Sequence, residues 1–137
     1  MLKDKTSSAI VAVSDLGRAR DLYSNTLGLE SGGDDMEGVL EYRTGDTQLV
    51  VYRSKGVRPG TGNAVAWSGG NDVDAIAEDL RAKGVTLEEY PELGLAIDRG
   101  VHRSDGFAGI WFKDPDGNMI EFSYDQGVNE TARDKWG

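Results

Sequence analysis

The chain has 137 residues, and its 15 Lys and Arg against 24 Asp and Glu give a formal net charge of −9. This length favours a single domain with a sizeable core. The acidic balance argues against binding to nucleic acid or to an anionic membrane surface, and it permits a cationic ligand. Cysteine is absent, which excludes disulfides and thiolate metal sites, and the single His allows at most one imidazole ligand per chain.

The apolar runs of the chain are short. None approaches the ~18 residues of a membrane-spanning helix, and residues 9–13 are too few for the apolar region of a secretory signal. We therefore expect a cytoplasmic protein. Residues 125–137 are polar and predict a loose tail or a short docking segment.

The first half of the chain predicts a strand, a helix and a hairpin. Residues 8–13 form a short apolar run typical of a strand. Residues 16–27 carry apolar side chains at near-helical spacing after Asp15, a good N-cap residue. Residues 39–43 and 48–53 flank a turn that contains glycine, which predicts a β-hairpin.

The second half repeats this order. Residues 63–68 predict a strand, and residues 73–80 a helix with one apolar face. Residues 107–112 and 118–124 flank an Asp-Pro-Asp-Gly turn and predict a second hairpin. The segment 92–106 is the extra length of this half and is expected to be a loop.

The two halves also align with each other, since Asp15 matches Asp72 and Gly28 matches Gly84. The sequence therefore predicts an α+β fold built from two βαβββ modules, at about residues 8–58 and 59–124. A pseudo-two-fold arrangement of the two curved sheets would leave a groove between them, which is a usual kind of place for a small ligand.

Two motifs resemble a known superfamily. Residues 13–29 (VSDLGRARDLYSNTLGL) and 110–122 (IWFKDPDGNMIEF) are similar to the opening segment and the last hairpin of the vicinal oxygen chelate superfamily. That group contains glyoxalase I, extradiol dioxygenases, methylmalonyl-CoA epimerase, fosfomycin-resistance enzymes and bleomycin-resistance proteins. The resemblance covers roughly residues 8–124. It implies paired βαβββ modules, and it implies a homodimer.

The resemblance also implies where a divalent metal would bind. Enzymes of this superfamily hold the metal with up to four His, Glu or Gln side chains from the first and last strands of each module. The matching positions are Ser8, Leu49, Ala64 or Val65, and Glu121. Gln48 is adjacent to Leu49, but a one-residue slip would turn it to the opposite face. One ligand cannot hold a transition metal tightly, so we expect no metal cofactor.

Strand alternation predicts which side chains line the groove. Glu121 is expected to point into it, as a general base, as an acceptor for a ligand, or as a solvated remnant of a metal position. Trp111 and Phe107 share a face, and Trp67 belongs to the second module's first strand. These rings could stack on a flat apolar or cationic ligand, with core packing as the alternative. Further expected lining residues are Ser8, Leu49 and Met119.

His102 is the one imidazole in the sequence and is expected in a loop between strands. It could act as a catalytic acid or base at the edge of the groove, or it could be a solvated loop residue. Arg53 and Arg58 could clamp an anionic ligand, but exposed arginines at the end of a hairpin are the commoner interpretation.

Two classes of function remain. The first is a metal-independent small-molecule binder that sequesters an aromatic or cationic ligand, as the resemblance to bleomycin-resistance proteins implies. The second is a glyoxalase-like lyase, isomerase or dioxygenase acting on a small vicinal-oxygen substrate, with a displaced metal site or with Glu121 and His102 acting without metal. The missing ligands favour the first class.

Overall fold

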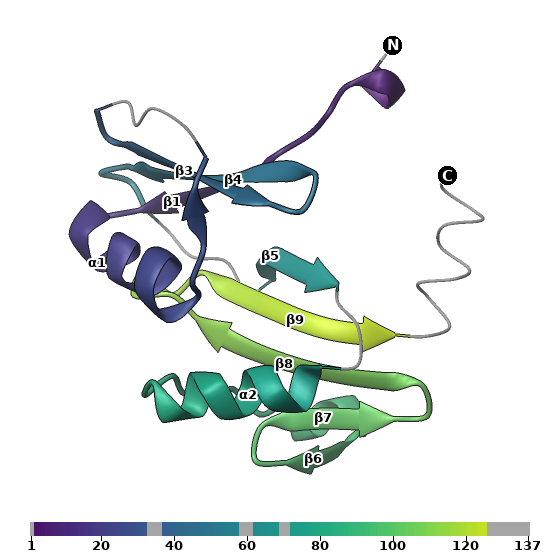
Figure 1. The fold of residues 1–137 in the computed structure, drawn as a ribbon. Coiled ribbons are helices and arrows are strands. Elements are labelled where there is room, and N and C mark those ends of the chain that lie inside the picture. Colours follow the sequence, from purple (N-terminus) through teal and green to yellow (C-terminus); the bar gives the residue numbers. More distant parts are fainter. Residues whose placement is uncertain (1, 33–36, 58–61, 69–71, 126–137) are drawn as a thin grey trace. The chain divides into compact units, whose positions relative to one another are not determined.

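The computed structural model describes residues 2–32, 37–57, 62–68 and 72–125 (Figure 1). Arg58 and the predicted tail beyond Asp125 lie outside these residues. The chain divides into two compact units, one made of Met1–Val65 and Asp114–Asn118, the other of Ala66–Lys113 and Met119–Gly137. Within the described residues, no helix is long and apolar enough to cross a membrane.

The first unit contains a four-stranded sheet in the order β1-β4-β3-β2, with β1 parallel to β4 and the other pairs antiparallel. A short 3₁₀ turn, η1, precedes it. The elements are η1 (Leu2–Asp4), β1 (Ala9–Val13), α1 (Leu16–Arg20), η2 (Asp21–Thr26), β2 (Glu30–Ser31), β3 (Val39–Thr44) and β4 (Thr47–Arg53). The predicted strand, helix and hairpin of this half are confirmed.

The helix of the first unit begins and ends at signals present in the sequence. The Asp15 carboxylate accepts a hydrogen bond from the Arg18 backbone N–H at 3.0 Å, and this bond lowers the pKa of Asp15. The chain continues from α1 into the π-helical turn η2. Gly28 then takes a φ of +71°, a conformation that glycine adopts without strain, and the helical segment stops.

The helical segment covers one face of the first sheet. Tyr42 of β3 lies with its ring 6.1 Å from that of Tyr23 in η2, and its hydroxyl is 2.8 Å from Ser24 Oγ. Leu49 is opposite Tyr42 in the strand register and therefore shares that face. The buried side chains of this core are Val11, Val13, Ala19, Tyr23, Leu40, Tyr42, Leu49 and Val51. Gln48 and Val50 point to the opposite face.

The turn Asp114–Asn118 belongs to the first unit, and Asp114 is the centre of its hydrogen bonds. This carboxylate is 4% exposed and accepts bonds from the Tyr23 hydroxyl at 2.9 Å and from the side chain of Asn118 at 2.8 Å. The backbone N–H groups of Asp116 and Asn118 donate to its other oxygen at 2.9 Å. Burial, and then the charge of Asp114, raise the pKa of Tyr23 above its usual value.

The second unit contains α2 and most of a five-stranded sheet in the order β5-β9-β8-β7-β6. Its elements are β5 (Asn63–Ser68, which begins in the first unit), α2 (Val73–Ala82), η3 (Pro91–Leu93), β6 (Ala96–Asp98), β7 (Val101–Ser104), β8 (Phe107–Lys113) and β9 (Met119–Asp125). Apart from β6, the order repeats that of the first sheet. The duplicated topology and the α+β fold predicted from the sequence are therefore confirmed.

One prediction about the second unit is wrong. The segment expected as a loop contains η3 and the antiparallel hairpin of β6 and β7. The hairpin turns at Arg99 and Gly100, which take positive φ angles of 49° and 88°. Strands of three and four residues are too short to show an alternating pattern, and the turn lacks the usual Asn-Gly or Asp-Gly pair, so the sequence signal was weak.

Candidate functional site

Helix α2 packs on one face of the second sheet. Its Asp74 pairs with Arg103 of β7, which lies in the same register row as Ala108 and Tyr124. Strand alternation places Ile110, Phe112 and Ile120 on this covered face, where all three are buried. The opposite face carries His102, Phe107, Gly109, Trp111, Glu121 and Ser123, and we call it the aromatic face.

Gly109 leaves room for the rings of Phe107 and Trp111 to lie above the middle of strand β8. The ring centroids of Phe107 and Trp111 are 6.4 Å apart, and the interplanar angle is 34°. A Cβ at position 109 would lie 2.8 Å from Phe107 Cζ and 3.3 Å from Trp111 Cη2. Glycine therefore permits a nearly continuous aromatic surface, and both rings remain half-buried rather than covered. The prediction that Phe107 and Trp111 share a face is confirmed.

Glu121 lies beside this surface. It is opposite Trp111 in the antiparallel register of β8 and β9, and it is half-buried. Its Oε2 accepts a hydrogen bond from the hydroxyl of Ser123 at 2.9 Å. The predicted orientation of Glu121, on the face of Trp111 and away from α2, is confirmed. An indole ring and a carboxylate on adjacent strands can together contact a flat cation.

His102 lies in strand β7 and not in a loop, so that prediction is wrong. It is 0% exposed and sits opposite Gly109 in the register. Its Nε2 accepts a hydrogen bond from the Tyr90 backbone N–H at 2.9 Å, and its Nδ1 is 3.0 Å from the Gly100 carbonyl oxygen. This pattern assigns the neutral tautomer with the proton on Nδ1, in which both nitrogens are engaged within the protein.

His102 and Tyr90 both contact the ring of Trp111. The His102 ring contacts the Trp111 ring edge-on, with 4.9 Å between the ring centroids. The Tyr90 ring also contacts Trp111 edge-on, with 5.8 Å between the centroids. The backbone bond between Tyr90 and His102 holds the segment that supplies the second ring. His102 therefore contacts Trp111 on the aromatic face, from the neighbouring strand β7.

Tyr90 is a residue of this site that sequence reasoning missed. Its hydroxyl donates to the sulfur of Met119 at 3.4 Å, and Met119 is only 9% exposed. Burial, and then the charge of Glu88, raise the pKa of Tyr90. The only signal for it is an aromatic residue before Pro91, in a segment without strand or helix periodicity.

Trp67 is separate from this cluster. It is half-buried and lies on the same face of β5 as the buried Val65. Within the described part of the chain, the ring neighbours of Trp111 are Tyr90, His102 and Phe107. The structure therefore does not bring Trp67 into the ring cluster of the aromatic face.

The first unit corrects one predicted site residue. Leu49 is 1% exposed and lies in the core beneath α1 and η2, so it cannot line an open surface. Its neighbour Gln48 is exposed on the opposite face, as is Ser8, the residue directly before β1. Arg53 is exposed at the end of β4.

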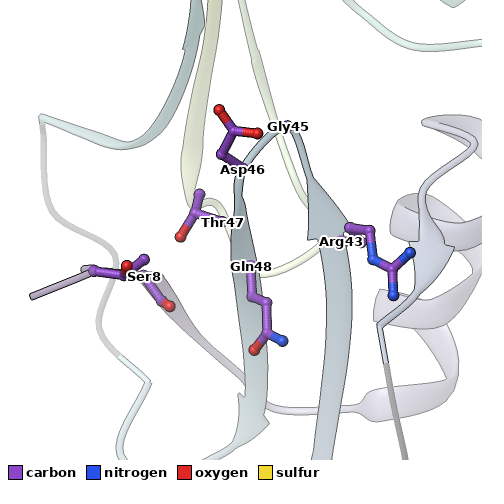
Figure 2. Close-up of a pocket in the computed structure, with 7 residues that line it drawn as sticks. Ser8, Arg43, Gly45, Asp46, Thr47 and Gln48 are labelled. Atoms are coloured by element: carbon purple, nitrogen blue, oxygen red, sulfur yellow. The ribbon is translucent and has the colours of Figure 1, made fainter.

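Ser8 and Gln48 belong to a polar pocket of about 410 Å³ at one end of the first sheet (Figure 2). Its lining residues are Thr6, Ser8, Arg43, Gly45, Asp46, Thr47 and Gln48. The pocket lies at the β3–β4 turn. Ser8, Arg43 and Gln48 extend into it from the face of the sheet opposite Leu49, which we call the open face because α1 and η2 do not cover it.

The residues at the expected metal positions do not fit a transition metal. After the register correction these positions hold Ser8, Gln48 or Val50, an alanine or valine of β5, and Glu121. Only one of them is a carboxylate, whereas divalent metal sites usually have at least three protein ligands. Among the described residues, no group of three His, Cys, Asp or Glu side chains is placed to hold a metal ion.

Comparisons with known proteins agree with this fold. The model of the Glyoxalase/Bleomycin resistance protein/Dioxygenase superfamily matches residues 6–122. FosX, a fosfomycin resistance protein from Mesorhizobium loti, is similar with a TM-score of 0.67 at 16% identity, over 94% of this chain and 98% of that one.

Two further solved structures have the same fold. Lactoylglutathione lyase from Agrobacterium tumefaciens matches with a TM-score of 0.65 at 16% identity, over 88% of this chain and 92% of that one. A glyoxalase/bleomycin resistance protein/dioxygenase from Nocardioides matches with a TM-score of 0.63 at 19% identity, over 88% and 83% of the two chains. With the family model matching most of its length, the chain belongs to the Glyoxalase/Bleomycin resistance protein/Dioxygenase superfamily.

Proposed function

We propose that this protein binds a small aromatic cation on the aromatic face of its second sheet, without a metal ion. The observation that carries the proposal is the surface of Phe107 and Trp111 over Gly109, with the Glu121 carboxylate on the next strand. A planar ligand can stack on such rings, and a positive charge gains from both the ring faces and the carboxylate. The net charge of −9 attracts cations in the same sense.

The rigidity of the surface supports binding. Edge-on contacts from His102 and Tyr90 hold the Trp111 ring from two sides. A side chain that is already fixed loses little conformational freedom when a ligand stacks on it. His102 therefore serves the ligand through Trp111, and Glu121 supplies the charge recognition.

A second candidate function is that of a glyoxalase-like lyase, isomerase or dioxygenase acting on a vicinal-oxygen substrate. The shared fold with lactoylglutathione lyase and FosX supports it, as does the position of Gln48 on the open face, since an amide oxygen can ligate a metal. The donor set of Ser8, Gln48 and Glu121 is poor for that chemistry, so we rank it below binding.

The proposal includes a homodimer in the cytoplasm. Both sheets end in edge strands, β1 and β2 in one and β5 and β6 in the other, and such edges tend to be covered in proteins. Light scattering at micromolar concentration should give twice the mass of one chain, 14.8 kDa. A monomer mass would contradict the dimer, and cell fractionation tests the location.

The binding experiment uses N-methylquinolinium and its uncharged isostere 1-methylnaphthalene, titrated by calorimetry. Trp111→Ala should weaken both ligands by about 1–3 kcal/mol, because it removes the stacking surface. Glu121→Gln should weaken only the cation, because the variant loses charge and keeps shape. Glu41→Gln, a half-buried carboxylate of the first sheet, is the matched control and should change neither.

Three results would contradict the proposal. If Glu121→Gln weakens both ligands equally, the carboxylate does not recognise charge. If Glu41→Gln weakens the cation as much as Glu121→Gln does, overall charge and not this site attracts it. If neither Trp111→Ala nor Glu121→Gln changes binding, the ligand site lies elsewhere.

A further inference from the structure

We propose that the pocket at the end of the first sheet is a binding site for a small oxyanion group, a carboxylate or a phosphate. This site lies in the first unit and does not depend on a ligand at the aromatic face. Its basis is a row of three side chains across three neighbouring segments, Ser8, Gln48 and Arg43 (Figure 2).

The strand register places these three residues in one row. Gln48 of β4 is directly opposite Arg43 of β3. The parallel pairing of Ala9 with Leu49 places the preceding residues, Ser8 and Gln48, beside each other. All three side chains therefore lie on the face opposite Leu49, which is the face that α1 and η2 do not cover.

The row offers hydrogen-bond donors. The Arg43 guanidinium carries five N–H groups in a planar fork that matches carboxylate and phosphate oxygens, and Gln48 and Ser8 add an amide and a hydroxyl donor. In the part of the chain that the structure describes, these three side chains make no hydrogen bond or ion pair. The pocket of about 410 Å³ is large enough for an oxyanion carried by a larger molecule.

The chemistry of the pocket opposes a metal cation. The family places metal ligands at positions that correspond here to Ser8 and to the open face of β4. A guanidinium one strand away repels a divalent cation and attracts an anion. Two carboxylates work against an anion: Asp46 lines the pocket, and Glu30 of β2 is directly opposite Arg43 in the strand register. A single arginine should therefore give weak binding, on the order of millimolar.

The test is a titration of isotope-labelled protein with sodium phosphate and, separately, with sodium acetate, followed by NMR at constant ionic strength. The backbone amides of Arg43 and Gln48 should shift in a saturable way. Arg43→Gln should weaken the interaction by roughly 10-fold or more, the loss expected for a charge-assisted contact. Asp46→Asn should strengthen it, because the variant removes the repelling charge and keeps the size.

Arg53→Gln is the matched control, since it removes the same charge from an exposed residue of β4 that does not line the pocket. It should leave the titration unchanged. Saturation with phosphate alone or with acetate alone supports the site and assigns its ligand class.

The proposal is overturned if sodium chloride produces the same shifts, or if the shifts do not saturate. It is also overturned if Arg53→Gln weakens binding as much as Arg43→Gln. Each variant should first show a spectrum as well dispersed as that of the parent protein. Because Arg43 and Asp46 are exposed, their substitution should not prevent folding. Failure of this test would leave the proposed function of the aromatic face unaffected.

Discussion

Replacing Tyr23 with phenylalanine removes one oxygen atom from the most extensive buried hydrogen-bond network of the first unit. The Tyr23 hydroxyl donates to Asp114 at 2.9 Å, and the two residues are 0% and 4% exposed. In the variant, that carboxylate oxygen loses its bond from position 23 and keeps its bond from Asn118. A hydrogen bond to a charged group contributes about 1.5–3 kcal/mol, so we expect the free energy of unfolding to fall by that amount.

Tyr42→Phe is the matched control. The Tyr42 hydroxyl lies 2.8 Å from Ser24 Oγ, which is a neutral and only partly buried partner. A neutral hydrogen bond contributes about 0.5–1.5 kcal/mol. The two variants lose the same atom, and both keep a ring in the contact between positions 23 and 42. The difference between them therefore measures the combined effect of the charge of Asp114 and its deeper burial.

Urea denaturation followed by far-ultraviolet circular dichroism measures both free energies. The dependence on urea concentration should be equal in the two variants, because the surface exposed on unfolding is unchanged. If Tyr23→Phe costs no more than Tyr42→Phe, the network around Asp114 does not stabilise the first unit as argued.

Three further predictions follow from particular contacts. Because the pKa of Tyr23 is raised, the unfolded chain loses the proton of this hydroxyl above about pH 10 while the folded chain keeps it. The free energy of unfolding should therefore fall by roughly 1.4 kcal/mol for each pH unit above that value because of this group. Urea denaturation at several pH values should show that Tyr23→Phe removes this part of the pH dependence. Gly109→Ala should lower the free energy of unfolding by about 1–3 kcal/mol and alter the near-ultraviolet circular dichroism of Trp111, because the new Cβ would lie too close to the Phe107 ring. Gly56→Ala is the control and should change neither quantity, because a Cβ at position 56 has no heavy atom within 4 Å. Elemental analysis of the purified protein should find far less than one equivalent of zinc, nickel, manganese or iron per chain, and a full equivalent that Glu121→Gln removes would contradict the metal-free proposal.

Much of the fold was predictable because the signals are local and occur twice. The aspartate before the helix and the glycine after it occur at Asp15 and Gly28 and again at Asp72 and Gly84, so the same sequence signals mark both helices. Both glycines take a positive φ, whereas only the Asp15 side chain makes a capping hydrogen bond. The faces of β8 and β9 followed from simple alternation, which correctly placed Glu121 with Trp111. Long strands with one buried face carry this information in every second residue.

The surroundings of Trp111 were not predictable in the same way. His102 and Tyr90 reach it from a short hairpin and from an irregular segment, and neither has a periodic pattern. Their positions depend on bonds between a backbone N–H and a ring nitrogen, and between a hydroxyl and a sulfur, which no spacing in the sequence encodes. A single histidine beside two arginines has the composition of an exposed loop, yet tertiary contacts bury it.

The error at Leu49 shows how much chemistry depends on one step of register. Matching Leu49 to Glu121 pairs a side chain that faces α1 with one that faces away from α2, so the true counterpart is Gln48 or Val50. The polar Gln48 beside a row of apolar neighbours was the available signal. With Leu49 on the open face, the first sheet would offer an apolar wall. With Gln48 there, it offers an amide in the same register row as Arg43, and a guanidinium beside an amide suits an anion better than a metal cation.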